Sequence, residues 1–386
     1  MEFELTSMAT DATDMAGAVP ELGWVLILIT TNVRSHAPTL SHSRNALRSF
    51  ARPRSDGRPW RVLISNDDGV SAPGLRALVS YLRRITHTEL YVCGPFGERS
   101  GQSNAISIGG RGPLHAFEIP SIPGVVKSYA VDGTPADSII VALRTNLVVE
   151  DPVRFDLVVS GINRGDNSGI HVVYSGTCGA AREANHHGIP SVAFSLDDHN
   201  ARSEESYGFS AWTAAHIVRE TLDSLAVDGS KAAFSRTVIN VNMPGIVAQV
   251  PVDLAFFEGI HLARQGRHSS TSTMVEVDVE DDFHEKNAHK DTEICLNTAR
   301  EKRVMRAFRH TNFRHVDDQT PGTDYALLSQ GWATVTVLDS MMDVPLHPAD
   351  SAVRYDAKHV EAVRGIVARA AGHMRVPACC ERGEEI

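Results

Sequence analysis

The stretch Arg61–Gly74, RVLISNDDGVSAPG, decides the fold of this chain. It opens with an apolar run at residues 62–64, which is typical of a short buried strand. The run leads to two adjacent carboxylates, Asp67 and Asp68, and then to Gly69, whose backbone freedom suits a sharp strand-to-helix turn. Neighbouring carboxylates at the end of a buried strand repel each other and are costly to desolvate, so one interpretation is a bound divalent cation. The alternative is an Asx-type turn with solvated carboxylates.

Strand and helix patterns alternate outward from this turn. Apolar residues recur at helical spacing after Pro73, which suits the first turn of a helix. Further strand patterns cover residues 90–93, 125–131, 155–160, 191–195, 238–241, 273–279, 323–328 and 333–338, and further helix patterns cover residues 178–187, 207–226 and 351–371. Another helix is predicted to start at residues 133–137, where Thr134 suits the N-cap, Pro135 the first position and Asp137 the third. Near-continuous apolar strands that alternate with helices predict an α/β fold with a parallel sheet covered on both faces.

Composition separates three regions from this core. Residues 1–59 are acidic first and then basic, and we expect a disordered N-terminal extension. Residues 265–320 are polar and charged, which favours a protruding β-hairpin or insertion over a second core. Residues 346–386 are expected to hold the C-terminal helix and a polar tail.

The overall composition limits the partners and the compartment. The formal net charge of −10 gives no basic field for a nucleic-acid duplex, and no apolar run approaches the ~20 residues of a membrane span. The five cysteines show no C-x-x-C spacing, so neither a zinc site nor a disulfide framework is indicated. We therefore expect a protein of a reducing compartment, the cytoplasm, without a membrane partner.

Polar residues follow three of the predicted strands at their carboxyl ends, where ligands of parallel sheets collect. These residues are Asn66–Asp68, Arg99–Gly101 and Ser160–Asn163. Carboxylate, hydroxyl and amide oxygens suit Mg²⁺ or Mn²⁺ better than zinc. A fourth loop, Ser175–Thr177, precedes a helix whose free N–H groups can hold a phosphate. Together these features suggest metal-assisted hydrolysis of a phosphate ester.

Three competing motifs are missing from the sequence. The first strand is not followed by the G-x-G-x-x-G of a dinucleotide fold, and the chain has no G-x-x-x-x-G-K-[ST] phosphate loop. The two carboxylates are adjacent, whereas an aspartyl-phosphate phosphatase has them two residues apart. Histidine catalysis stays open, because the chain has 18 histidines, among them His171, His186 and His187.

Six motifs in order resemble the SurE family of survival proteins, which are 5′/3′-nucleotidases. They are SNDDGVSAPG (65–74), ERSGQSN (98–104), GTPAD (133–137), SGINRGDN (160–167), YSGT (174–177) and PGTDYALLSQG (321–331). The resemblance implies a Rossmann-like core within a nucleotidase domain at residues 60–345. It also implies one divalent cation per subunit and a homodimer or homotetramer that uses the protruding hairpin and exchanged C-terminal elements.

The resemblance also assigns roles to single residues. The positions that match the family's metal ligands are Asp67, Asp68, Ser100 and Asn163, and those that match its phosphate pocket are Asn66, Asn167, Ser175, Gly176 and Thr177. Asp67 or Asp68 would be the catalytic base. Residues 168–171 and 96–98 depart from the family's pattern, which bears on substrate preference more than on chemistry.

The leading hypothesis is a divalent-metal-dependent phosphomonoesterase that hydrolyses nucleoside monophosphates to nucleoside and phosphate. One alternative keeps this chemistry and changes the substrate to another small phosphate ester or a polyphosphate. The other is a non-catalytic nucleotide-binding homologue, which the intact set of ligand positions disfavours.

Overall fold

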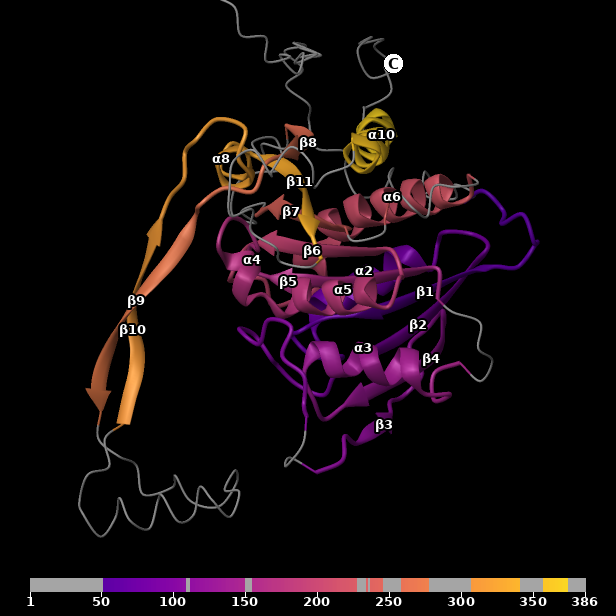
Figure 1. The fold of residues 1–386 in the computed structure, drawn as a ribbon, viewed down its shortest axis with the longest axis horizontal. Helices are drawn as coiled ribbons and strands as arrows, with labels where there is room; N and C mark the ends of the chain where they lie inside the picture. Colours follow the sequence, from indigo (N-terminus) through magenta and orange to yellow (C-terminus); the bar gives the residue numbers. More distant parts are fainter. Residues whose placement is uncertain are drawn as a thin grey trace, which may run out of the picture. The chain divides into compact units, whose positions relative to one another are not determined.

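A nine-stranded mixed sheet forms the centre of the fold in a computed structural model of the chain (Figure 1). The structure describes residues 51–108, 112–149, 155–227, 234, 237–245, 258–277, 307–340 and 357–373. The strand order is β3-β4-β2-β1-β5-β6-β7-β11-β8. Its strands are β1 (Trp60–Ser65), β2 (Thr88–Pro95), β3 (Ala116–Glu118), β4 (Val125–Val131), β5 (Leu157–Arg164), β6 (Ser191–Asp197), β7 (Thr237–Pro244), β8 (Gly259–Ala263) and β11 (Trp332–Asp339).

The strand β1 lies near the middle of this sheet and pairs in parallel with β2 and β5. Its side chains alternate between two cores: Val62 and Ile64 pack on one face and Leu63 packs on the other, all fully buried. The six strands from β4 to β7 in the sheet order run parallel, whereas β3 and β11 are antiparallel to their neighbours β4 and β7. The parallel strands therefore carry their carboxyl ends to one edge.

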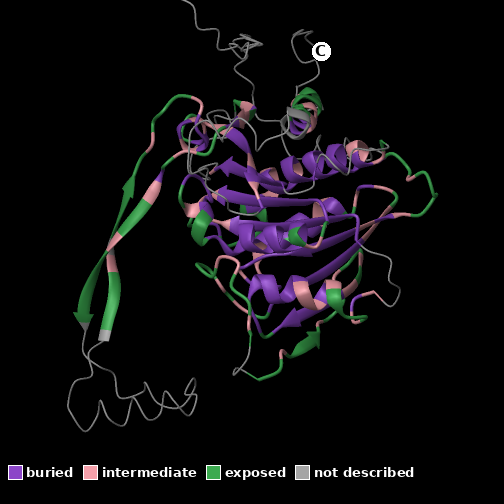
Figure 2. Cartoon of the chain, viewed as in Figure 1, coloured by how far each residue is buried: buried purple, intermediate pink, exposed green. Residues whose placement is uncertain are grey.

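Helices cover both faces of the sheet, as the apolar strands require. The core that includes Val62 and Ile64 is shared by α2 (Pro73–Leu82), α6 (Gly208–Leu225) and α10 (Ala357–His373). The core around Leu63 is shared by α3 (Pro135–Arg144) and α5 (Gly176–His186). Figure 2 shows the resulting buried interior. The described part of the chain also contains the short helices α4 (His171–Tyr174), η1 (Glu204–Tyr207) and α8 (Asp324–Leu328).

Two further strands, β9 (Ser269–Val277) and β10 (Ala307–Val316), form an antiparallel sheet of their own. Figure 1 shows this pair extending away from the main sheet, and Figure 2 shows that most of its surface is exposed. An α/β core with a parallel centre, a protruding hairpin and a C-terminal helix confirms the predicted fold class. Among the described residues, no helix combines the length and apolar character needed to cross a bilayer.

The structure corrects the strand predicted at residues 323–328, which is the helix α8. Thr323 takes the extended backbone of an N-cap, and Asp324 occupies the first turn, where its charge suits a helix start. A short apolar run does not distinguish a strand from a short buried helix. The strands β3, β8 and β10 were not predicted, because their sequences lack a long apolar run.

The expected disordered extension does not hold for residues 51–59. Ala51 is fully buried, the indole N–H of Trp60 donates to the carbonyl of Arg52, and the Arg54 guanidinium pairs with the buried carboxylate of Asp156. This segment therefore belongs to the fold. Residues 1–50, including the apolar run at 24–29, lie outside the described residues.

Candidate functional site

The turn after β1 joins three elements at the carboxyl edge of the sheet. Asp67 is 3% exposed, and its Oδ1 accepts a hydrogen bond of 2.5 Å from the Thr177 hydroxyl at the start of α5. Its backbone carbonyl accepts a 2.7 Å bond from the Arg99 N–H, which lies in the loop after β2. Gly69 takes a φ of +97°, so the turn uses the freedom expected of this glycine.

Asp68 connects the same turn to the end of β5. Its Oδ2 accepts a hydrogen bond from the Arg164 backbone N–H at 3.1 Å, next to Asn163. The ladder between β5 and β6 shifts register between Ser160 and Asn163, which gives the strand end a bulge. The Asn163 amide group donates to the carbonyl of Gly165 at 2.8 Å, so the side chain is held within this loop.

The two carboxylates are unfavourably placed when both are charged. Burial raises the pKa of Asp67, and burial together with the neighbouring Asp67 charge raises the pKa of Asp68 to about 7. The buried Asn66 Oδ1 has no hydrogen-bond partner among the described groups. A divalent cation would offset the repulsion, and these hard oxygen donors fit Mg²⁺ or Mn²⁺.

The start of α5 lies directly against Asp67. The Ser175 hydroxyl caps the helix by accepting a 3.0 Å bond from the Cys178 N–H. A Cβ at Gly176 would lie 2.8 Å from the Asp67 Cβ and 3.1 Å from the Pro135 Cγ. Only glycine therefore lets the helix start approach the carboxylate pair this closely, and this approach places an anion-binding helix end beside a cation site.

Two predicted residues are held differently. Ser100 is exposed, and its hydroxyl donates to the Glu98 carboxylate at 3.1 Å. Asn167 is anchored on the strands β6 and β7: its side-chain amide donates to the Ser195 hydroxyl at 2.8 Å, and its N–H donates to the Asn242 amide oxygen at 2.7 Å. The direct contacts therefore link Asn66–Asp68 with Ser175–Thr177 and the strand end at Asn163. The roles of Ser100 and Asn167 stay predictions.

A cavity of about 200 Å³ opens beside Asp68. Besides Asp68, its charged and polar lining consists of Glu98, Arg164, Arg202 and Tyr207. The Arg164 guanidinium donates to Glu98 at 3.3 Å. Sequence reasoning reached Glu98 and Arg164 only as members of the motifs ERSGQSN and SGINRGDN, with no role assigned to them, whereas Arg202 and Tyr207 carry no local signal.

A histidine pairing also escaped the sequence. The His171 Nδ1 lies 3.2 Å from the Asp166 Oδ2, five residues earlier. Burial lowers the pKa of His171, but the hydrogen bond and charge of Asp166 outweigh it and raise that pKa. His186 instead bonds the Ser340 carbonyl, and His187 bonds Glu183 within α5 and its C-cap. Of these three histidines, only His171 has its partner, Asp166, in the loop that carries the predicted site residue Asn167.

Known proteins resemble this chain in sequence. Residues 62–272 match the family model described as survival protein SurE. The protein named 5'-nucleotidase SurE of Pseudoalteromonas atlantica is 34% identical over 296 residues, which cover 76% of this chain and 97% of that protein. The protein of the same name from Parvibaculum lavamentivorans is 34% identical over 229 residues, which cover 58% of this chain and 72% of that protein.

A solved structure extends the similarity to the fold. The crystal structure of the SurE protein from Aquifex aeolicus superimposes with a TM-score of 0.51 at 25% sequence identity, and it covers 78% of this chain and 99% of that one. The range of the family model, residues 62–272, includes the strand ends and the helix start described above. The chain therefore belongs to the SurE family, whose curated relatives reported above are named as 5'-nucleotidases, enzymes that hydrolyse phosphomonoesters.

Proposed function

We propose that this protein hydrolyses nucleoside monophosphates to nucleoside and phosphate with the help of a divalent cation. One observation carries the proposal: of the adjacent carboxylates Asp67 and Asp68, Asp67 lies directly against the start of α5, with the Gly176 backbone packed on it. A cation site and an anion-binding helix end in contact are what phosphate-ester hydrolysis requires.

The proposed ligands of the cation are Asp67, Asp68, Ser100 and Asn163. When bound, Mg²⁺ or Mn²⁺ supplies Lewis acidity toward a phosphoryl oxygen. The backbone N–H groups at the start of α5 would bind the remaining phosphoryl oxygens and stabilise the charge that develops on them, except that of Ser175, which donates to the His171 carbonyl at 3.1 Å. This division of labour needs no covalent intermediate on the protein.

Asp68 is the proposed base of the pair, because it lines the cavity whereas Asp67 is held by Thr177. Its carboxylate would accept the proton of the attacking water. Arg164 and Arg202, which line the same cavity, would attract the anionic substrate. Asn66 and Asn167 are proposed pocket residues, which would hold the loops around the phosphate.

We also propose a homodimer or homotetramer in a reducing compartment, the cytoplasm. The hairpin β9–β10 exposes apolar side chains, namely Met274, Val275, Phe308, Phe313 and Val316. Such a set of side chains is suited to contact with a second copy of the chain. The described cysteines, Cys93 and Cys178, are both free, as expected in a reducing compartment.

A substrate panel tests the proposed activity. Purified protein with Mg²⁺ or Mn²⁺ is assayed for phosphate release from AMP, GMP, a 3′-nucleotide, a sugar phosphate, a short polyphosphate and p-nitrophenyl phosphate, with Asp68→Asn as the blank. The proposal predicts the highest kcat/KM for nucleoside monophosphates. A higher value for a sugar phosphate or polyphosphate would favour the alternative substrate. No release from any compound would favour a nucleotide-binding homologue.

A further inference from the structure

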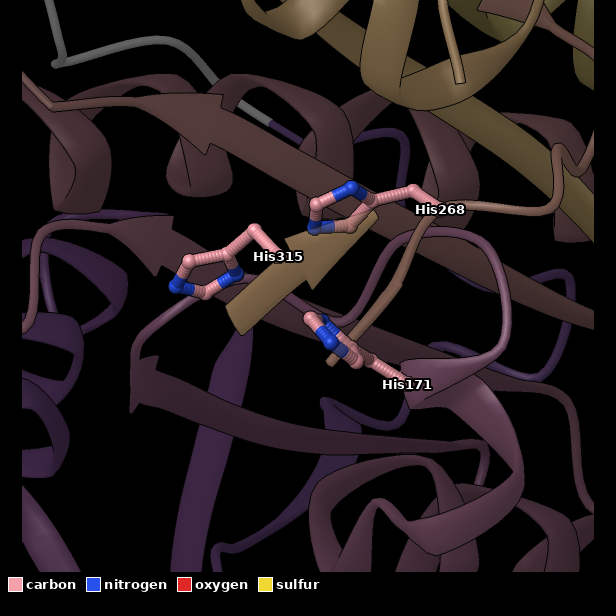
Figure 3. Close-up of side chains that lie close together, drawn as sticks. All are labelled: His171, His268 and His315. Carbon is pink, nitrogen blue, oxygen red and sulfur yellow. The ribbon is translucent and has the colours of Figure 1, made fainter. Parts of the chain in front are cut away.

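Three histidines, none of which is among the proposed active-site residues, meet at the root of the hairpin (Figure 3). His171 begins α4, His268 immediately precedes β9, and His315 lies next to the end of β10. Each ring offers one nitrogen, and these three nitrogens all lie within 4.8 Å of one another. We propose that His171, His268 and His315 form a second metal site, which takes one transition-metal ion of the zinc class.

Two of the three rings already direct a nitrogen at one point. The His171 Nε2 lies 2.8 Å from the Ser270 hydroxyl oxygen, and the His315 Nδ1 lies 3.2 Å from the same atom. Asp166 contacts the other nitrogen of His171, at 3.2 Å. A carboxylate on the far nitrogen is the usual second-shell arrangement of a metal-binding histidine, because it fixes the tautomer and the ring orientation.

The third ring carries an unsatisfied nitrogen. His268 is 1% exposed, and its Nδ1 is buried without a hydrogen-bond partner among the described groups. The nearest carboxylate oxygen, Oδ1 of Asp317, lies 3.7 Å away. The ring is fixed by stacking on Tyr325, with a centroid distance of 3.5 Å and an interplanar angle of 2°. In Figure 3 the other nitrogen of this ring, Nε2, faces His171 and His315, so Nε2 is the proposed ligand atom and Nδ1, beside Asp317, is the outer nitrogen.

The three nitrogens lie only slightly farther apart than the ligands of a tetrahedral zinc ion would. Nitrogens around a tetrahedral ion at zinc–nitrogen distances lie about 3.3 Å apart, so the widest pair must approach by roughly 1.5 Å. His315 is exposed and can rotate to close this gap, whereas His268 and His171 are held by Tyr325 and Asp166. Water would complete the coordination. Imidazole donors select zinc-class ions, whereas the oxygen donors at Asp67 and Asp68 select Mg²⁺ or Mn²⁺.

Such an ion would tie three segments together. It would clamp both strands of the hairpin root to the loop at residues 166–171, which also contains the proposed pocket residue Asn167. The site is therefore a structural clamp that fixes the hairpin relative to the loop beside the substrate, and it takes no part in the hydrolysis itself.

Cobalt binding to the full-length protein tests the site. After chelator treatment, the protein is titrated with Co²⁺ and followed by visible absorption, which reports coordination rather than turnover. We expect two Co²⁺ per chain, and one of them should remain in Asp68→Asn. His171→Ala and His315→Ala should each lower the affinity for that remaining ion at least tenfold, and Asp166→Asn should lower it about tenfold.

The matched control is His310→Ala. His310 lies on the same strand as His315 and bonds Ser272, outside the cluster, so this variant should bind as the wild type does. Circular dichroism of the metal-free variants checks that the exposed His315 can be removed without unfolding. The proposal is overturned if the wild type binds a single Co²⁺ that Asp68→Asn abolishes, or if His171→Ala and His315→Ala bind as tightly as His310→Ala.

Discussion

The neighbouring carboxylates Asp67 and Asp68 suit the binding of a cation but destabilise the fold when both are charged. Both carboxyl groups are largely buried, and each raises the free energy of the other's charged form. The fold retains the pair because the turn fixes it through Thr177 and the Arg164 N–H. Groups held against their own preference in this way are typical of functional sites.

The first prediction concerns the metal-free stability of Asp68→Asn. Burial and the Asp67 charge raise the folded-state pKa of Asp68 to about 7, above its unfolded value. The protonated group is favoured in the fold, so its contribution is present at low pH and is lost as the pH rises through about 7. The substitution should therefore raise the free energy of unfolding of chelator-treated protein at pH 8 by an amount on the order of a few kcal/mol, which appears as a higher melting temperature, and the gain should be much smaller at pH 5.

The exposed Glu118→Gln on β3 is the control, and it should show no such pH dependence. Thermal denaturation at both pH values provides the measurement. An equal or larger gain at pH 5 than at pH 8 would contradict the account of the carboxylate pair.

The second prediction concerns Gly176. A methyl group there would lie 2.8 Å from the Asp67 Cβ, which is not a flexible chain end, so Gly176→Ala should move the helix start away from the pair. We expect kcat/KM to fall by at least a hundredfold for every phosphomonoester, because the contact concerns phosphate and not base or sugar. The matched control is Gly97→Ala on the same edge, where an added Cβ meets nothing within 4 Å. Retention of full activity by Gly176→Ala would show that the anion binds elsewhere.

At this scale the sequence allowed the turn, its carboxylates and its glycine to be predicted, because they are contiguous in the chain. The close contact between Gly176 and Asp67 could not be read from it, since it joins residues more than a hundred positions apart. The same is true of His171 with His268 and His315. Side-chain clusters of this kind depend on tertiary packing, for which one sequence carries no local signal.

Among the elements, α3 shows how far local chemistry reaches. The residues Thr134, Pro135 and Asp137 predicted its N-cap, first position and third position, and the structure has a capping box in which Thr134 and Asp137 bond each other's backbone N–H groups. The helix α8 begins with a similar Thr-Asp signal, but its five residues are too few for a periodic pattern. At residues 323–328 the capping signal was therefore a better guide to the helix than the apolar run, which had suggested a strand.

The third prediction concerns Asp324, the first residue of α8. Its carboxylate accepts hydrogen bonds of 2.9 Å from the backbone N–H groups of Gly169, Gly266 and Tyr325, and so ties the helix to the loop after β5 and to the segment before the hairpin. Asp324→Ala would leave these donors without the carboxylate, so we expect a loss of roughly 3 kcal/mol in urea denaturation. The exposed Asp132→Ala is the control. A loss below that of the control would contradict this role.

The fourth prediction concerns the hairpin. Phe313 is 65% exposed on β10, and Phe308 is exposed on the same strand. If a second copy covers them, Phe308→Ser with Phe313→Ser should shift the protein toward monomer in size-exclusion chromatography with light scattering, whereas Arg314→Lys should not. A wild type that is already monomeric, or a double variant with unchanged mass, would refute the proposed assembly.

For the whole molecule, the alternation of strands and helices was sufficient to predict the fold class. The order of strands was not, because β1 pairs with β5 across nearly a hundred residues, and sequence proximity does not encode that pairing. The position of β11, antiparallel to β7 and parallel to β8, could not be read from the sequence either. Topology thus decides which polar loops share an edge, and family resemblance supplied what local patterns lacked.

The central claim is that the carboxylate pair holds the cation on which nucleotide hydrolysis depends. Its most direct test measures phosphate release from AMP by chelator-treated protein, before and after Mg²⁺ or Mn²⁺ is restored, in the wild type and in Asp68→Asn. The account predicts no activity without the cation, full recovery of the wild type on its return, and kcat of the variant lower than that of the wild type by at least a hundredfold once the cation is restored. Activity that survives the chelator, or a restored variant that matches the wild type, would contradict it.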